Sequence, residues 1–96
     1  MSFEKILTED RRLVLLRILN DMISYKANSS VLTIAMEHFG HAVSRDYVRT
    51  QLAWLAEQQL VQSEDIGPVV VVTLTQRGQE VVRGLAVVPG VSRPGA

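Results

Sequence analysis

The sequence predicts an α+β protein that is mainly helical and contains one small β-hairpin. Within residues 43–61, Val48, Leu52 and Leu55 recur at the i, i+4, i+7 spacing of a helix that buries one face. Residues 69–75 (VVVVTLT) are dominated by β-branched side chains and follow a Gly-Pro pair, which is typical of the second strand of a hairpin. The 96 residues are enough for one domain with a modest core.

The first predicted helix begins at Thr8, because this hydroxyl residue can cap a helix and acidic residues follow it. Residues 1–7 are expected to form an N-terminal arm. The apolar side chains of this helix cover a wide arc, made of Leu15, Ile18, Leu19, Met22 and Ile23 with Val14 and Leu16 at its edges. A helix this apolar is contacted from several sides, so it is either the central helix of the domain or part of a dimer interface.

Two further helices are predicted next, with a tight turn between them. Ser29 or Ser30 is expected to cap a short helix over residues 31–39, and Gly40 occupies the position where a left-handed residue ends a helix. Ser44 is expected to cap the helix that follows. Two helices joined by a short turn that contains glycine form a helix-turn-helix pattern.

A β-hairpin and a fourth helix complete the predicted fold. Gly67 and Pro68 form the hairpin turn, and Thr75 caps a last helix over residues 76–85. Residues 87–96 are rich in proline and glycine, so we expect them to form a loose C-terminal tail.

Val69 and Val71 share one face of the second strand, and both faces of that strand are therefore apolar. A hairpin exposed to water on one side would alternate apolar with polar residues. We therefore expect another part of the protein to cover these two valines. Either Val87 and Val88 of the tail or a second protomer could cover them.

Composition and charge limit the possible functions. Ten basic and ten acidic residues cancel, so any binding of nucleic acid must come from a local patch rather than from bulk charge. Cysteine is absent, which excludes disulfides and thiolate metal sites and fits a reducing cytoplasm. The first residues lack the apolar core of a signal peptide, and no segment approaches the ~20 apolar residues needed to cross a bilayer. We expect a cytoplasmic protein without a membrane partner.

The order helix, helix, turn, helix, hairpin, helix over residues 8–85 resembles the winged helix-turn-helix superfamily. Its most specific part, SRDYVRTQLAWLAEQQLVQ followed by a hairpin and then LTQRG, is similar to the MarR- and ArsR-type pattern. There a recognition helix precedes a wing, and Leu-Thr-x-x-Gly opens the next helix. The resemblance implies a winged-helix domain over residues 8–86 and a function as a transcriptional regulator that binds duplex DNA. The short chain also resembles small winged-helix proteins of Mu-like phages and prophages.

The resemblance implies that the N-terminal part of the third helix docks on DNA, where arginine can donate two hydrogen bonds to guanine. The candidate DNA-binding residues are Ser44, Arg45, Arg49 and Thr50. The alternative is that these are ordinary polar residues of an amphipathic helix. The predicted wing also departs from the family, because it has no cation and carries Glu64 and Asp65.

Four other residues are candidates for contacts with DNA or with a protein partner. Arg11 and Arg12 could add contacts to the DNA backbone. Tyr47 and Trp54 lie on one flank of the third helix and either form an aromatic partner-binding edge or cover the margin of the core. A partner interface would combine these two rings with the valines of the hairpin.

Self-association is expected because the first helix is so apolar and the hairpin carries excess valines. A homodimer is the usual symmetric oligomer, and two recognition helices can read a palindromic site. The alternative function is a protein-interaction module of the same fold, a phage or accessory component that does not bind DNA. Neutral charge and an acidic hairpin motivate this alternative.

Catalysis and metal binding are not expected. His38 and His41 lie near Glu37, but no cysteine or third histidine is available to complete a zinc site. The sequence contains no glycine-rich phosphate loop and no Gly-x-Ser-x-Gly nucleophile motif. We therefore predict no enzymatic activity, no cofactor and no small-molecule site.

Overall fold

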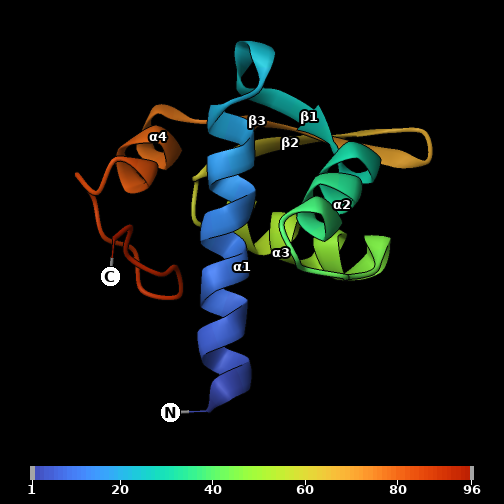
Figure 1. Ribbon diagram of the computed structural model, residues 1–96. Coiled ribbons are helices and arrows are strands. Elements are labelled where there is room, and N and C mark those ends of the chain that lie inside the picture. Colours follow the sequence, from blue (N-terminus) through green and yellow to red (C-terminus); the bar gives the residue numbers. More distant parts are fainter. Residues whose placement is uncertain (1, 96) are drawn as a thin grey trace.

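Four α-helices and a three-stranded antiparallel sheet make up the structure, a computed structural model that describes residues 2–95 (Figure 1). The α+β prediction is confirmed. In chain order, the elements are α1 (Phe3–Asn20), the 3₁₀ turn η1 (Ile23–Tyr25), β1 (Lys26–Asn28), α2 (Ser29–His38), α3 (Arg45–Glu57), β2 (Val61–Ile66), β3 (Val69–Leu74) and α4 (Gln76–Val82). Within residues 2–95, none of the helices combines the length and apolar character that a bilayer crossing requires.

Helix α1 begins at Phe3, well before the predicted start at Thr8, which is therefore wrong. Ser2 is the actual cap, because its hydroxyl oxygen accepts a hydrogen bond from the Lys5 amide at 3.1 Å. Glu4 adds a favourable negative charge in the first turn. The sequence offers two capping residues, and the helix uses the earlier one. Most of the expected N-terminal arm is helix.

Helix α1 is the central helix of the domain. Its leucine-rich face is buried within the single chain, at Leu13, Leu15, Leu16, Ile18 and Leu19. In Figure 1, α1 stands between α2 and α4, with α3 behind it and the sheet at its C-terminal end. Ile23 was expected on this buried arc but follows the end of the helix, and it is 93% exposed in η1.

The sheet has one strand more than predicted. Strand β1 pairs with β3, which places β3 in the centre in the order β1-β3-β2. The sequence gives little sign of β1, because Lys26, Ala27 and Asn28 include no β-branched or aromatic residue. A short strand of this kind forms because β3 presents an unpaired edge.

The two faces of β3 have different surroundings. Val72 and Leu74 face the helices and are buried, as predicted for one face of the strand. Val69 and Val71 lie on the opposite face, where they are half-buried. The register places Ile66 opposite Val69 on the same outer face of the sheet.

The C-terminal tail was expected to be loose, but it packs against α1. Val88 and Val91 are 3% and 8% exposed and belong to the hydrophobic core. The Ser92 amide donates a hydrogen bond to the Glu9 carbonyl at 3.2 Å. Val87 is 60% exposed, so this part of the expected cover for the outer sheet face stays in solvent. The loose-tail prediction is wrong.

The cap at the start of α2 differs from the prediction, whereas the residue that follows its end agrees with it. Asn28 caps this helix in place of Ser29 or Ser30, and its side-chain oxygen accepts from the Val31 amide at 2.8 Å. The Ser29 hydroxyl instead accepts from the Val70 amide at 3.1 Å and ties the start of α2 to β3. Gly40 follows α2 with φ of 89°, the left-handed conformation that was predicted.

The remaining boundaries agree closely with the sequence. The Ser44 hydroxyl caps α3 by accepting from the Tyr47 amide at 3.0 Å, and the Thr75 hydroxyl caps α4 by accepting from the Gly78 amide at 3.0 Å. Gly67 and Pro68 form the turn between β2 and β3, with Gly67 at φ of 58°. Helix α4 is shorter than predicted and ends at Val82.

Candidate functional site

Helix α3 is held by a buried seam that leaves its opposite side in solvent. Val48, Leu52 and Leu55 are fully buried, as the i, i+4, i+7 spacing predicted. Burying three aliphatic side chains stabilises the position of the helix by roughly 5–8 kcal/mol before entropic costs. The exposed side is therefore a rigid surface, on which the four candidate DNA-binding residues lie.

The two arginines of this surface are exposed and not enclosed by the fold. Arg45 and Arg49 are one helical turn apart on α3. The Arg49 guanidinium donates a hydrogen bond to the carbonyl of Pro68 at the hairpin turn. A guanidinium has five N–H donors, so this bond leaves Arg49 able to donate to a ligand. The contact fixes the hairpin turn beside the start of α3.

The two hydroxyl residues differ in the hydrogen bonds that remain available. The Ser44 oxygen accepts from the Tyr47 amide, so its O–H is still free to donate to a phosphate. The Thr50 hydroxyl donates to the Asp46 carbonyl at 3.0 Å and can offer only its lone pairs to a ligand. Ser44 is therefore suited to contact an anion, whereas Thr50 is suited to contact a donor group.

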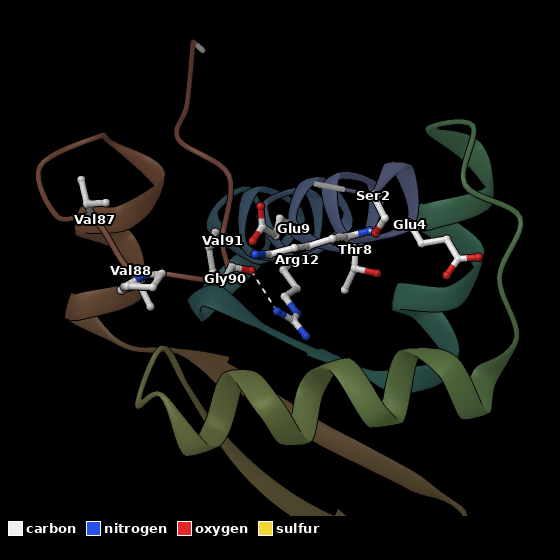
Figure 2. A pocket seen from close by; sticks show the side chains of 11 residues that line it. Ser2, Glu4, Thr8, Glu9, Arg12, Val87, Val88, Gly90 and Val91 are labelled. Carbon is white, nitrogen blue, oxygen red and sulfur yellow. Dashed lines mark hydrogen bonds between the residues drawn. The ribbon is translucent and has the colours of Figure 1, made fainter.

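Arg12 lies between α1 and α3 and does not reach toward solvent. Its guanidinium carbon is 3.8 Å from the centre of the Trp54 ring, and its Nε donates to Gln51 Oε1 at 2.8 Å. Its Nη1 donates to the Gly90 carbonyl at 2.9 Å, as Figure 2 shows. Desolvation lowers the pKa of Arg12, against the opposing influence of Tyr47 and Glu9. Arginine remains charged at neutral pH, so a positive charge is held inside this contact.

Arg11, one position earlier on α1, also contacts an aromatic ring of α3. Its guanidinium carbon is 5.3 Å from the centre of the Tyr47 ring, and its Nε donates to His41 Nδ1 at 3.3 Å. Arg11 therefore makes one hydrogen bond within the fold and Arg12 makes two, and the expectation that they contact a DNA backbone stays a prediction. Tyr47 and Trp54 are half-buried against these arginines and cover the margin of the core.

The four residues predicted as a partner interface do not form one surface. Tyr47 and Trp54 contact the arginines of α1, whereas Val69 and Val71 lie on the outer face of the sheet. Sequence reasoning missed the pairing of arginine with aromatic residues. The signal was present, because Arg11 and Arg12 are adjacent on one helix and the two rings lie on one side of another.

A groove of about 640 Å³ runs between the N-terminal half of α1 and the tail (Figure 2). Its wall includes Ser2, Glu4, Lys5, Thr8, Glu9 and Val88. Charges of both signs line it, and Arg12 and Gly90, which also line it, are joined by the hydrogen bond from Arg12 Nη1 to the Gly90 carbonyl. The groove is the seam along which the tail packs, and its lining does not define a ligand.

The two histidines have separate structural roles. The His38 ring packs edge-on against Phe39 with ring centres 5.9 Å apart. His41 accepts the hydrogen bond from Arg11. Within residues 2–95, no group of three or more His, Cys, Asp and Glu side chains is placed to hold a metal ion.

The fold and the site define a class of small α+β protein in which an exposed helix face that carries two arginines adjoins a β-hairpin. No family model matches the chain. It is 57% identical over 89 residues to the uncharacterized protein gp26 of Escherichia phage Mu, an alignment that covers 93% of this chain and 92% of gp26. It is 44% identical over 78 residues to an uncharacterized protein of Haemophilus influenzae, with 80% of this chain and 76% of that protein covered.

The chain therefore belongs to the family of phage Mu gp26. This confirms the expected relationship to proteins of Mu-like phages. The winged-helix assignment stays a prediction, because neither relative bears on it.

Proposed function

We propose that the protein is a cytoplasmic winged-helix DNA-binding protein that regulates transcription by binding duplex DNA through α3. The order α1, α2, α3, hairpin, α4 supports the winged-helix part of this proposal, with β1 as a third strand beside the hairpin. The observation that carries the DNA-binding part is the exposure of Arg45 and Arg49 along one edge of the solvent side of α3.

The N-terminal half of α3 has the chemistry to bind a phosphate and an adjacent base edge. The positive end of the helix dipole and the free O–H of Ser44 favour an anion at that end. Arg45 and Arg49 then point along the same side, and the small exposed Ala53 permits close approach to a groove. Each arginine contact to guanine contributes roughly 1–3 kcal/mol of discrimination.

The hairpin limits the affinity that we expect. Glu64 and Asp65 are exposed on β2, and their negative charges repel the phosphates of DNA. Because the net charge is zero, no bulk electrostatic attraction offsets this repulsion. The protein then depends on local contacts by α3, and a homodimer doubles their number at a palindromic site.

The test is a titration of labelled duplexes from the protein's own operon at several salt concentrations. Affinity should fall steeply with salt, and the double variant Arg45→Ala/Arg49→Ala should reduce the slope of log K against log salt by roughly 1 per arginine. The matched control is Arg77→Ala/Arg83→Ala, which removes two exposed cations from the region of α4. Absence of binding at low salt, or an equal effect of both double variants, would contradict the proposal.

The second candidate function is a protein-interaction module. It is favoured by the outer sheet face, where Ile66 is 49% exposed beside half-buried Val69 and Val71. Glu64 of β2, which pairs with Val71, lies on this same face. Purification from the native host separates the candidates, because a stoichiometric protein partner free of nucleic acid supports the module. The variant Val71→Lys should then release that partner while leaving any DNA binding unchanged.

A further inference from the structure

One side of α1 is exposed toward both ends of the helix and half-buried at its middle, at Asp10 and Val14. The residues on it are Phe3, Ile6, Asp10, Val14, Arg17 and Asp21, which recur at intervals of three or four positions. At about 100° per residue they fall within a stripe roughly 80° wide. In Figure 1, α2 and α4 lie on either side of α1 and α3 lies behind it. Phe3, Ile6, Arg17 and Asp21 of this stripe are exposed to solvent.

This open stripe is too apolar for a helix face that only meets water. Phe3 is 73% exposed and Ile6 is 45% exposed, in the two N-terminal turns. Phe39, at the end of α2, is 62% exposed. It borders a hollow of about 290 Å³ that is also lined by Val14, Arg17, Ile18 and Asp21. Exposed apolar groups that gather in one place indicate a surface that is covered by a partner.

The turn after α1 exposes a further apolar side chain. Ser24 and Tyr25 adopt positive φ angles of 59° and 56°, which are unfavourable for residues other than glycine. This turn leaves Ile23 almost fully in solvent at the C-terminal end of α1. The helix thus has an exposed apolar side chain near each end, Phe3 and Ile23, and a half-buried Val14 between them.

The charges on the stripe indicate which partner fits. Asp10 and Arg17 are seven residues apart with Val14 near their midpoint. An antiparallel copy of the same helix places Asp10 opposite Arg17 of the partner subunit, and the symmetry repeats this pair on the other side of Val14. A parallel copy would place each charge opposite its own kind. These two charges are therefore complementary to those of a second copy in the antiparallel direction alone.

We infer that the open stripe of α1 is the interface of a twofold homodimer, with two α1 helices packed antiparallel across an axis near Val14. Two reciprocal Asp10–Arg17 ion pairs flank the axis. At 1.5 Å of rise per residue, the same register brings Phe3 level with η1 of the partner subunit, where Ile23 is exposed. Leu13, Leu15, Leu16 and Leu19 take no part, because the single chain already buries them.

This inference names the surface of the dimer invoked in the proposed function, but it does not rest on DNA binding. Self-association is measured without DNA, so failure of one proposal leaves the other standing. The measurement is sedimentation equilibrium of the full chain over a concentration series. Circular dichroism of each variant shows whether it remains folded.

The decisive experiment exchanges charges across the axis. Asp10→Arg and Arg17→Asp should each raise the dissociation constant of the dimer at least about tenfold above that of the wild type. Each variant places like charges opposite one another at two positions of its own dimer. An equimolar mixture of the two variants should form a heterodimer, because every pair is then of opposite sign. The double variant Asp10→Arg/Arg17→Asp should recover the homodimer.

Two further variants locate the surface independently. Phe3→Glu should dissociate the dimer, whereas Asp65→Arg on the exposed hairpin reverses a charge away from α1 and should not. A monomeric wild-type protein, single variants that associate like wild type, or a mixture that stays monomeric would overturn the inference. Dissociation by Val71→Lys in place of the α1 variants would assign the interface to the outer sheet face and overturn it as well.

Discussion

Arg12 connects three parts of the chain that are distant in sequence. From α1 it stacks on Trp54, bonds to Gln51 on α3, and bonds to the Gly90 carbonyl in the tail. Gly90 has φ of 97°, and a Cβ atom there would lie 2.6 Å from Trp54 Cζ2. Only glycine lets the tail pass this close to the ring, so its carbonyl can reach the guanidinium.

We expect Arg12→Lys to lower the free energy of unfolding by about 2–3 kcal/mol, although it preserves the charge. A lysine ammonium lacks the planar fork that makes both hydrogen bonds while stacking on the indole. Urea unfolding followed by tryptophan fluorescence measures this change. Arg45→Lys, on the exposed face of α3, is the matched control and should change stability by less than ~0.5 kcal/mol. Equal stability of both variants would show that the Arg12 contacts contribute little.

Ser44 allows stability and DNA binding to be separated at one position. Ser44→Ala removes the cap of α3 and should cost about 1 kcal/mol of stability. Ser44→Asp retains a capping oxygen and should keep stability near wild type. The added negative charge should nevertheless weaken DNA binding, because it faces the proposed phosphate contact. Thermal unfolding and duplex titration of the same samples test both halves, and undiminished DNA binding by Ser44→Asp would remove Ser44 from the proposed interface.

The C-terminal tail contributes side chains to the hydrophobic core at residues 87–91. Val88 is 3% exposed and its neighbour Val87 is 60% exposed. Val88→Ala should therefore lower the free energy of unfolding by roughly 1–3 kcal/mol through lost burial and a cavity. Val87→Ala is the adjacent control and should change it by less than ~0.5 kcal/mol. Similar small effects of both substitutions in urea unfolding would mean that the tail does not stabilise the domain.

The elements that were predictable are those whose signals are local. Four local features are confirmed by the structure: the caps Ser44 and Thr75, the left-handed Gly40 and the turn at Gly67. Each depends only on residues a few positions away in the sequence. Strand β1 was not predictable, because its pairing with β3 depends on a segment more than forty residues away in sequence. The start of α1 was missed because two capping residues compete within its first turns.

The candidate site was predictable only in part for the same reason. Periodicity identified which side of α3 is exposed, and the structure places Arg45 and Arg49 there. The bond from Arg49 to Pro68 and the stacking of Arg12 on Trp54 join separate elements. No spacing within one segment could indicate them.

The whole molecule presents three surfaces of different character. One is the exposed side of α3 with its two arginines, another is the outer sheet face with Val69 and Val71, and the third is the open stripe of α1. The three arise from different elements. In the two proposals, a neutral chain binds an anion at one surface and a second copy at another, because its charge is distributed locally.

The central claim is that α3 binds DNA by its N-terminal half. The most direct measurement is a titration of ¹⁵N-labelled protein with an operon duplex at low salt, with the amide shifts followed by NMR. The claim predicts that the largest changes cluster at residues 44–53 and at the hairpin turn near Gly67, while the amides of α4 stay unchanged. No shifts at excess duplex, or shifts confined to the outer sheet face, would contradict it.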